Sequence, residues 1–202
     1  METLKIDFLS GALAHRLRYG GGRGQAIGRA LGFKPGQELN VVDATAGLGR
    51  DSFVMASLGA RVTMIERAPK LHAELAAGLE AAKSAPEVAE IIARMTLLFG
   101  DAKEHLPQLA PEVVYIDPMH PPRKSSALVK QDLRMVREIV GGDDDQLELL
   151  QVALAHAKKR VVLKWPRKAD RMKGAPAPSH QIIGKNTRFD VYMTHRSSAE
   201  QD

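Results

Sequence analysis

The sequence predicts an α/β fold built on a seven-stranded, mostly parallel sheet that ends in an antiparallel C-terminal hairpin. Short β-branched runs alternate with longer Ala- and Leu-rich segments, which is typical of β-α units around a parallel sheet. The last two strand candidates are separated by only a few residues, including Lys185 and Asn186, and this spacing favours a tight antiparallel hairpin. The 202 residues, 44% of them hydrophobic, suffice for one domain with a substantial core. We therefore expect the main domain at residues 37–196, after an accessory segment at 1–36 and before a polar tail at 197–202.

Each element follows from a local pattern, taken here in chain order. Apolar and β-branched runs predict strands at residues 39–43, 61–66, 95–99, 113–117, 160–164, 181–184 and 188–194. The intervening segments predict helices at residues 50–58, 69–84, 86–93, 126–140 and 145–157. Pro69 suits the first turn of a helix, where its missing N–H loses no hydrogen bond. Gly141 and Gly142 can end a helix with positive φ, and the aspartates at 143–145 can cap the next one.

Composition excludes several classes of enzyme. The chain has no cysteine, which rules out disulfides, thiolate zinc sites and cysteine nucleophiles. Its histidines show no metal-ligand spacing, and no glycine loop carries the Lys-Ser/Thr pair of a P-loop, so we expect no metal and no nucleotide hydrolysis. No apolar run approaches the roughly 20 residues that span a bilayer, and the N-terminus lacks a secretory pattern. These observations predict a soluble, cytoplasmic protein without a membrane partner.

The charge balance permits a polyanionic partner without requiring one, because 29 basic residues face 24 acidic ones, a net charge of +5. Basic residues gather at 15–23, 123–137 and 158–173, although such stretches are usually solvated surface. The glycine-rich stretch 19–24 is either a linker or a loop in which Arg23 meets phosphate. With only 4% aromatic residues, a stacking platform for RNA is disfavoured, so base recognition would use a single pocket.

The strongest local pattern is the segment 41–51, an apolar strand that ends at Asp43 and continues through a glycine turn into a helix. Gly47 and Gly49 let the backbone approach a ligand closely. Enzymes that bind NAD share this arrangement, but their fingerprint needs a third glycine where Ser52 stands. The turn is therefore weak evidence for NAD and fits a nucleoside without a pyrophosphate better.

Acidic side chains follow the next two strand candidates at the same edge of the sheet. Glu66 ends the second strand, about 20 residues after the turn, where a carboxylate can bind the diol of a ribose. Arg67 follows it. Asp101 comes just after the third strand, where it could accept a hydrogen bond from an adenine amine while the Ala102 N–H contacts the ring. An acid at a strand end is usually a helix cap or a surface group, but three such turns at one edge favour a nucleoside cofactor.

The fourth strand candidate ends in Asp117, followed by Pro118, Met119 and His120. A base amine is a poor nucleophile because its lone pair is delocalised into the ring, and acceptors for its hydrogens increase its reactivity as a methyl group arrives. The Asp117 carboxylate and the Pro118 carbonyl could be those acceptors, and His120 could stack on the base. The segment resembles the Asp-Pro-Pro-aromatic motif of amino-methyltransferases, although Met119 and His120 depart from it. Taken without the rest of the sequence, this segment fits a purely structural role equally well, in which Asp117 caps the following turn and the prolines stiffen the loop.

A series of motifs along most of the chain resembles one family, the RsmJ-type methyltransferases that modify guanine N2 in bacterial 16S ribosomal RNA (rRNA). The motifs begin at Gly11 (GALAHR), Gly20 (GGGRG), Asp43 (DATAGLGRD), Leu58 (LG), Asp117 (DPM), Ser126 (SALVK), Lys159 (KRVV) and Arg188 (RFDVY). The resemblance implies a Rossmann-like class I methyltransferase fold, S-adenosylmethionine (SAM) as cofactor, and 16S rRNA or the small ribosomal subunit as partner.

The resemblance also implies roles for individual residues. Those that would line the SAM pocket are Arg50, Asp51, Glu66, Arg67, Asp101, Ala102 and Asp117, and the strand end and glycine turn add Asp43, Gly47 and Gly49 to the predicted cofactor site. Those that would contact RNA phosphates, by position and charge, are Arg23, Lys124, Lys130, Arg134 and Lys164. Three alternatives stay open: an NAD-type oxidoreductase, a non-catalytic rRNA-binding module, and the same chemistry on adenine N6 or a protein amide. The sequence does not specify an oligomeric state.

Overall fold

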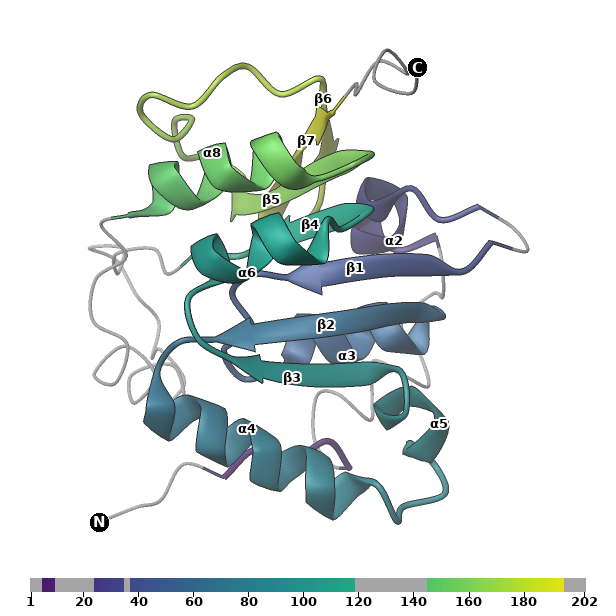
Figure 1. The fold of residues 1–202 in the computed structure, drawn as a ribbon. Helices are drawn as coiled ribbons and strands as arrows, with labels where there is room; N and C mark the ends of the chain where they lie inside the picture. Colours follow the sequence, from purple (N-terminus) through teal and green to yellow (C-terminus); the bar gives the residue numbers. More distant parts are fainter. Residues whose placement is uncertain (1–4, 10–23, 35–36, 119–144, 195–202) are drawn as a thin grey trace, which may run out of the picture.

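The computed structural model describes residues 5–9, 24–34, 37–118 and 145–194, which form a single mixed sheet with helices on both faces (Figure 1). The strands lie in the order β3-β2-β1-β4-β5-β7-β6. Their bounds are β1 Leu39–Asp43, β2 Ala60–Glu66, β3 Met95–Phe99, β4 Val113–Ile116, β5 Arg160–Pro166, β6 His180–Ile183 and β7 Thr187–Met193. Strands β1 to β5 pair in parallel, whereas β7 pairs antiparallel with both β5 and β6. The predicted fold class, with its antiparallel C-terminal hairpin, is confirmed.

Most of the described helices lie within a few residues of their predicted positions. They are α3 (Arg50–Ser57), α4 (Pro69–Ala82), α5 (Ala89–Ile92) and α8 (Gln146–His156). Two others are not predicted: α2 (Ala26–Leu31), which is short and follows a glycine-rich stretch, and α6 (Ala102–Leu109), which contains Pro107. The helix predicted at 126–140 lies outside the described residues. Among the helices in the described part of the chain, none has the length and apolar character needed to cross a membrane.

Each face of the sheet has its own hydrophobic core. Helices α2, α3 and α4 cover one face, where Phe53, Leu71 and Leu75 are buried. Helices α6 and α8 cover the other face, where Leu106 and Leu150 are buried (Figure 1). Strand β4 is buried along its whole length because it lies in the middle of the sheet and is covered on both sides.

Described parts of the predicted accessory segment pack into the core of the main domain. The ring of Phe8 stacks on that of Phe53, with ring centroids 5.3 Å apart. Helix α2 packs against β5, β6 and β7, and Nη1 of Arg160 on β5 donates a hydrogen bond to the Ala30 carbonyl at 3.2 Å. The N-terminal part of the chain is thus joined to the C-terminal strands.

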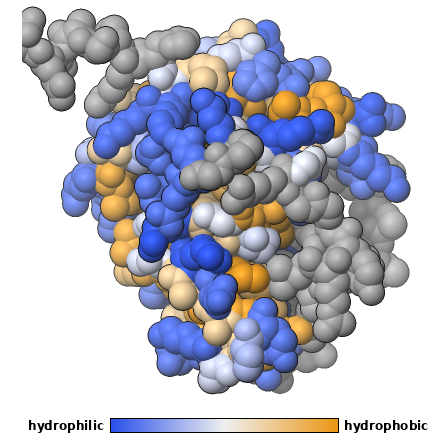
Figure 2. Space-filling view, turned by 90° about the vertical axis from the view of Figure 1, so that its right-hand side faces the viewer, coloured by the Kyte–Doolittle hydropathy of each residue, from blue (hydrophilic) through white to orange (hydrophobic). Residues whose placement is uncertain are grey.

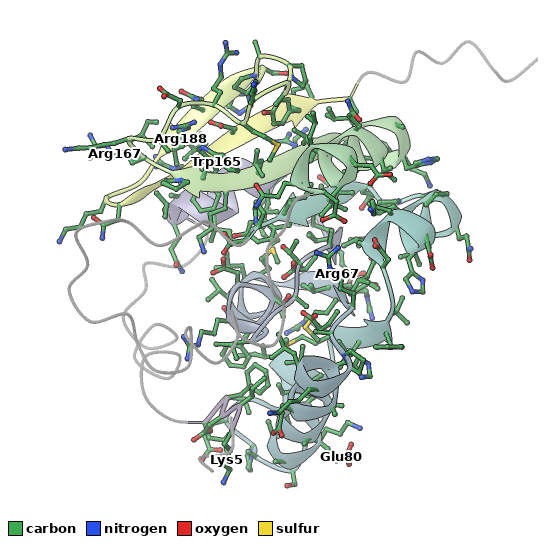
Figure 3. The ribbon with its side chains drawn as sticks, turned by 90° about the vertical axis from the view of Figure 1, so that its left-hand side faces the viewer. Lys5, Arg67, Glu80, Trp165, Arg167 and Arg188 are labelled. Carbon is green, nitrogen blue, oxygen red and sulfur yellow. The ribbon has the colours of Figure 1, made fainter. Side chains whose placement is uncertain are left out.

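The edge where the parallel strands end is the expected place for a ligand. The arrowheads of β1, β2 and β3 point to the left in Figure 1, and Figure 3 looks onto that edge. Strand β1 pairs with β2 on one side and β4 on the other, so the strand order reverses here, and open α/β sheets bind ligands at such a point. Figure 2 shows the opposite edge, where hydrophilic side chains are interspersed with hydrophobic ones.

Candidate active site

A cavity of about 430 Å³ opens at the carboxyl ends of β1, β2 and β4. All but one of the residues predicted to line a cofactor pocket lie on its wall: Asp43, Gly47, Arg50, Asp51, Glu66, Arg67, Asp101, Ala102 and Asp117. The exception is Gly49, which lies at the start of α3. Pro118 also lines the cavity. The structure therefore brings together residues from four separate turns.

The glycine turn after β1 contains two residues with positive φ. Gly47 has φ 55° and Gly49 has φ 68°, a region of backbone conformation that favours glycine. A Cβ at Gly49 would lie 2.8 Å from Cδ1 of Leu75, so packing excludes a side chain there as well. Glu66 holds the turn from β2, because its Oε2 accepts the N–H of Gly47 at 3.0 Å while its Oε1 accepts the N–H of Ala68 at 2.8 Å. Burial raises the pKa of Glu66.

Asp43 is buried beneath this turn and fixes the start of α3. Its Oδ2 accepts a hydrogen bond from the Ser52 hydroxyl at 2.5 Å, and its Oδ1 accepts one from the Thr45 N–H at 3.1 Å. Burial raises the pKa of Asp43 to about 7, although both hydrogen bonds act in the opposite direction. Ser52, which stands where an NAD fingerprint would have glycine, is thus the hydrogen-bond partner of a buried carboxyl group.

We expect Ser52→Ala to lower the free energy of unfolding by about 1–3 kcal/mol, because the buried Asp43 carboxyl loses a donor. The folded-state pKa of Asp43 is raised above its ordinary value of 3.8, so the stability that this group contributes falls as pH rises toward about 7. The Ser52 hydroxyl favours the ionised carboxylate, and its loss should extend that fall to higher pH. Urea unfolding at about pH 5 and about pH 8 tests this, and equal losses at both would contradict it.

A cluster around one ammonium group lies at the end of β4. The N–H of Asp117 donates to Oγ1 of Thr45 at 2.7 Å, which fixes the first residue after the strand. The Nζ of Lys164 on β5 lies 2.7 Å from Oδ2 of Asp117 and 2.6 Å from Oδ2 of Asp51. The hydroxyl of Tyr115 donates to the same oxygen of Asp51 at 2.6 Å. The turn after β1 thus holds the backbone of Asp117, and Lys164 on β5 holds its carboxylate.

The electrostatics of the cluster depend on Lys164. Burial raises the pKa of Asp117 to about 6, against the lowering effect of the Lys164 ammonium. Burial alone would lower the pKa of Lys164, but Asp51 and Asp117 raise it above its usual range. Lys164 therefore remains charged and favours the ionised form of Asp117. With Asp43 close by, this group of carboxylates can attract a cation and accept hydrogen bonds from an amine.

Sequence reasoning missed the parts played by Thr45 and Tyr115 and the ion pairs of Lys164. Lys164 is predicted to contact an RNA phosphate, and in the structure its ammonium lies between two carboxylates at the cavity. The pattern that could have found these ion pairs is a lysine between the apolar residues Leu163 and Trp165 of β5, since a charge that is partly withdrawn from water needs a partner.

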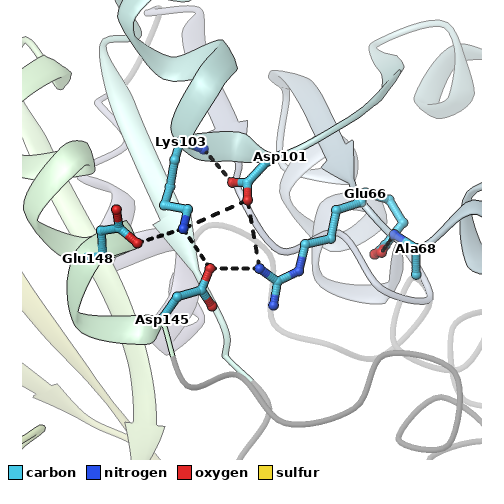
Figure 4. Close-up of polar contacts among 7 residues, drawn as sticks. Glu66, Ala68, Asp101, Lys103, Asp145 and Glu148 are labelled. Atoms are coloured by element: carbon cyan, nitrogen blue, oxygen red, sulfur yellow. Dashed lines mark hydrogen bonds and ion pairs between the residues drawn. The ribbon is translucent and has the colours of Figure 1, made fainter.

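An ion-pair network frames another part of the cavity, as Figure 4 shows. The Nη1 of Arg67 lies 2.7 Å from Oδ2 of Asp145 and 3.8 Å from Oδ2 of Asp101. The Nζ of Lys103 on α6 lies 2.8 Å from Oδ2 of Asp145 and 2.7 Å from Oε2 of Glu148. Burial alone would raise the pKa of Asp145, but hydrogen bonds from Arg67 and Lys103 lower it to about 2. The network joins the end of β2, the start of α6 and the start of α8.

Five predicted site residues lie outside the described part of the chain, namely His120, Arg23, Lys124, Lys130 and Arg134. Among the residues that are described, no group of His, Asp and Glu side chains could hold a metal ion. The described site is therefore a cavity with a glycine turn, several carboxylates and one half-buried lysine.

Comparison with known proteins gives consistent matches. The chain matches the family model described as "Putative SAM-dependent methyltransferase" over residues 1–194. It is 59% identical over 201 residues to "Ribosomal RNA small subunit methyltransferase J" of Agrobacterium fabrum, which covers 99% of this chain and 97% of that protein. The protein of the same name from Pseudomonas aeruginosa is 51% identical over 192 residues, which covers 94% of this chain and 73% of that protein. The crystal structure of a SAM-dependent methyltransferase from Neisseria gonorrhoeae is similar with a TM-score of 0.76 and 37% identity, over 100% of this chain and 79% of that one.

Proposed function

Because this chain belongs to the SAM-dependent methyltransferase family that includes the ribosomal RNA small subunit methyltransferases J, we propose that it methylates the exocyclic N2 amine of a guanine in 16S rRNA. One observation carries the proposal: Asp117 and Pro118 lie on the wall of the same cavity as the glycine turn and Glu66. Acceptors for an amine thus lie beside a site suited to a nucleoside cofactor.

The cavity fits SAM, the cofactor of the family. When bound, SAM supplies an electrophilic methyl group on a positively charged sulfur. The turn at Gly47 allows the backbone to lie close to the cofactor. Each carboxylate oxygen of Glu66 accepts one backbone N–H and keeps a second lone pair that can accept a hydrogen bond from a ribose hydroxyl. We assign the adenine end to Asp101 and Ala102, and the carboxylates around Lys164 suit a positively charged ligand.

In the proposed reaction, the Asp117 carboxylate accepts a hydrogen bond from the guanine amine, and the Pro118 carbonyl is a second acceptor. The amine nitrogen would take the methyl group as the bond between that carbon and sulfur breaks, with the electron pair going to the sulfur, and would lose one proton, which the Asp117 carboxylate can take up. Thr45 and Lys164 hold Asp117 before the amine arrives, so little reorganisation is needed during the reaction. Because the methyl donor is already activated, the protein needs no covalent nucleophile.

The proposal is tested by incubating the protein with radiolabelled SAM and with small ribosomal subunits or naked 16S rRNA from cells that lack the enzyme. Nucleoside chromatography should then show label in N2-methylguanosine. Label in another nucleoside would overturn the choice of base, and label in ribosomal protein alone would overturn the RNA substrate. If no label appears although calorimetry detects SAM binding, the proposed activity is refuted, and rRNA retained in a filter-binding assay would then identify a non-catalytic RNA-binding module.

We also predict that the basic residues after the catalytic motif contact RNA phosphates. Replacing both Lys130 and Arg134 by alanine should weaken rRNA binding and flatten its salt dependence, because each phosphate contact releases a counterion. Filter binding over a range of salt concentrations measures the slope. Lys158→Ala, which removes an exposed charge just before β5, is the control. The same slope in the double variant and the control would refute the contact.

A further inference from the structure

A second cavity, of about 320 Å³, lies beside the candidate active site where α2 meets the β6–β7 hairpin. Asp51 and Lys164 line both cavities, so the ion pair between them forms a shared wall. Lys164 also donates to Oδ2 of Asp117 at 2.7 Å. The second cavity therefore borders Lys164, whose ammonium contacts the proposed catalytic carboxylate.

The lining of the second cavity suits a nucleotide. Ile27 on α2 and Phe189 on β7 are core residues whose edges reach the wall of the cavity, so one side of it is apolar, as suits the face of a base. Gln25, at the N-cap position of α2, carries an amide that both donates and accepts, which is the chemistry that recognises the edge of a base. Lys185, exposed in the hairpin turn, supplies a cation for a phosphate group.

Contacts within the fold hold these walls in place. The Gly184 N–H donates to the Thr187 carbonyl at 2.8 Å and closes the hairpin. Arg188 of β7 is buried opposite Trp165 of β5 (Figure 3), and its Nη1 donates to the main-chain carbonyls of Pro166, the last residue of β5, and of Ala169. On the other side, α2 is held by the hydrogen bond from Arg160 to its backbone. The cavity is therefore built between elements that are fixed relative to the sheet.

We propose that the second cavity binds the target nucleotide of the RNA, with the base between α2 and β7 and its amine directed past Lys164 toward Asp117. This inference rests on the proposed function and deepens it. The ends of β1 and β2 would hold the methyl donor, while α2 and the β6–β7 hairpin would hold the acceptor. Such a division would bring the amine and the methyl group together beside Asp117 from different sides.

Two substitutions on the second cavity test this assignment. Gln25→Ala should raise the KM for rRNA about tenfold, because a base loses a hydrogen-bonding partner. Lys185→Glu should raise it by about tenfold or more and reduce its salt dependence, because a phosphate contact becomes a repulsion. Neither residue lines the first cavity, so SAM affinity measured by calorimetry without RNA should not change. Lys158→Glu, which makes the same charge change just before β5, is the matched control.

The outcomes separate this inference from the proposed function. If the wild-type protein labels rRNA and both variants keep the KM of the control, the acceptor binds elsewhere, although the proposed function stands. Loss of SAM affinity in either variant would assign the second cavity to the cofactor and overturn the inference. If the wild-type protein labels no RNA at all, the proposed function fails, and the inference fails with it.

Discussion

Asp117→Ala should reduce kcat for rRNA methylation by about 100-fold or more, because the target amine loses the carboxylate that accepts its hydrogen as the methyl group arrives. SAM affinity should change much less, since Asp117 is one of many groups on the cavity wall. Single-turnover assays with radiolabelled SAM measure the first quantity, and calorimetry measures the second.

Asp117→Asn separates the shape of this side chain from its charge. Asparagine keeps one acceptor oxygen but cannot take up the proton that the amine loses, so its turnover should lie nearer to that of the alanine variant than to that of the wild type. Turnover close to wild type in the alanine variant would exclude a catalytic role for Asp117. Parallel losses of turnover and SAM affinity would make it a cofactor ligand instead.

Lys164→Met should lower kcat at neutral pH and move the acid limb of the pH profile to higher pH. Burial raises the pKa of Asp117 to about 6 even though Lys164 opposes the increase. Without the ammonium, the pKa should rise further, and a protonated Asp117 cannot accept a hydrogen bond from the amine in the same way. The loss at about pH 7 should therefore be large and should be partly recovered at about pH 9.

The pH profile of kcat at saturating SAM measures this effect, and Lys158→Met is a matched control because Lys158 is exposed and lies just before β5. A merely structural role for Lys164 would lower kcat equally at every pH. An acid limb that stays in place would thus refute the proposed coupling between Lys164 and Asp117, whatever the size of the loss.

The parts of the fold that the sequence predicts best are those with local causes. The apolar run that ends at Asp43, followed by Gly47 and Gly49, identifies a strand, a turn and a helix without tertiary information, since the positive φ of both glycines is a property of the turn. The position of Glu66 at a strand end likewise indicates the cavity. Its hydrogen bond to the Gly47 N–H was not predictable, because it depends on the register between β1 and β2.

The parts that were missed depend on contacts between distant segments. Helix α6 contains Pro107, which argues against a helix locally, but Asp101 caps its first turn and Leu106 is buried in the core. Lys164 reaches Asp117 because β5 lies next to β4, and this follows from the strand order rather than from any local pattern. The basic residue that looked like an RNA contact is for this reason part of the carboxylate cluster.

The packing of α2 against the last strands has a consequence for how the protein is made. Residues 26–31 leave the ribosome early, whereas β6 and β7 lie near the end of the chain and emerge late. Bringing α2 and the hairpin together closes a long loop and costs conformational entropy. The contacts that offset this cost form only when both segments are present. During synthesis the early strands and the glycine turn can assemble first, whereas α2 can pack against β6 and β7 only after the hairpin has been synthesised. A nascent chain would thus complete the cavity that we assign to SAM before the surface that we assign to RNA.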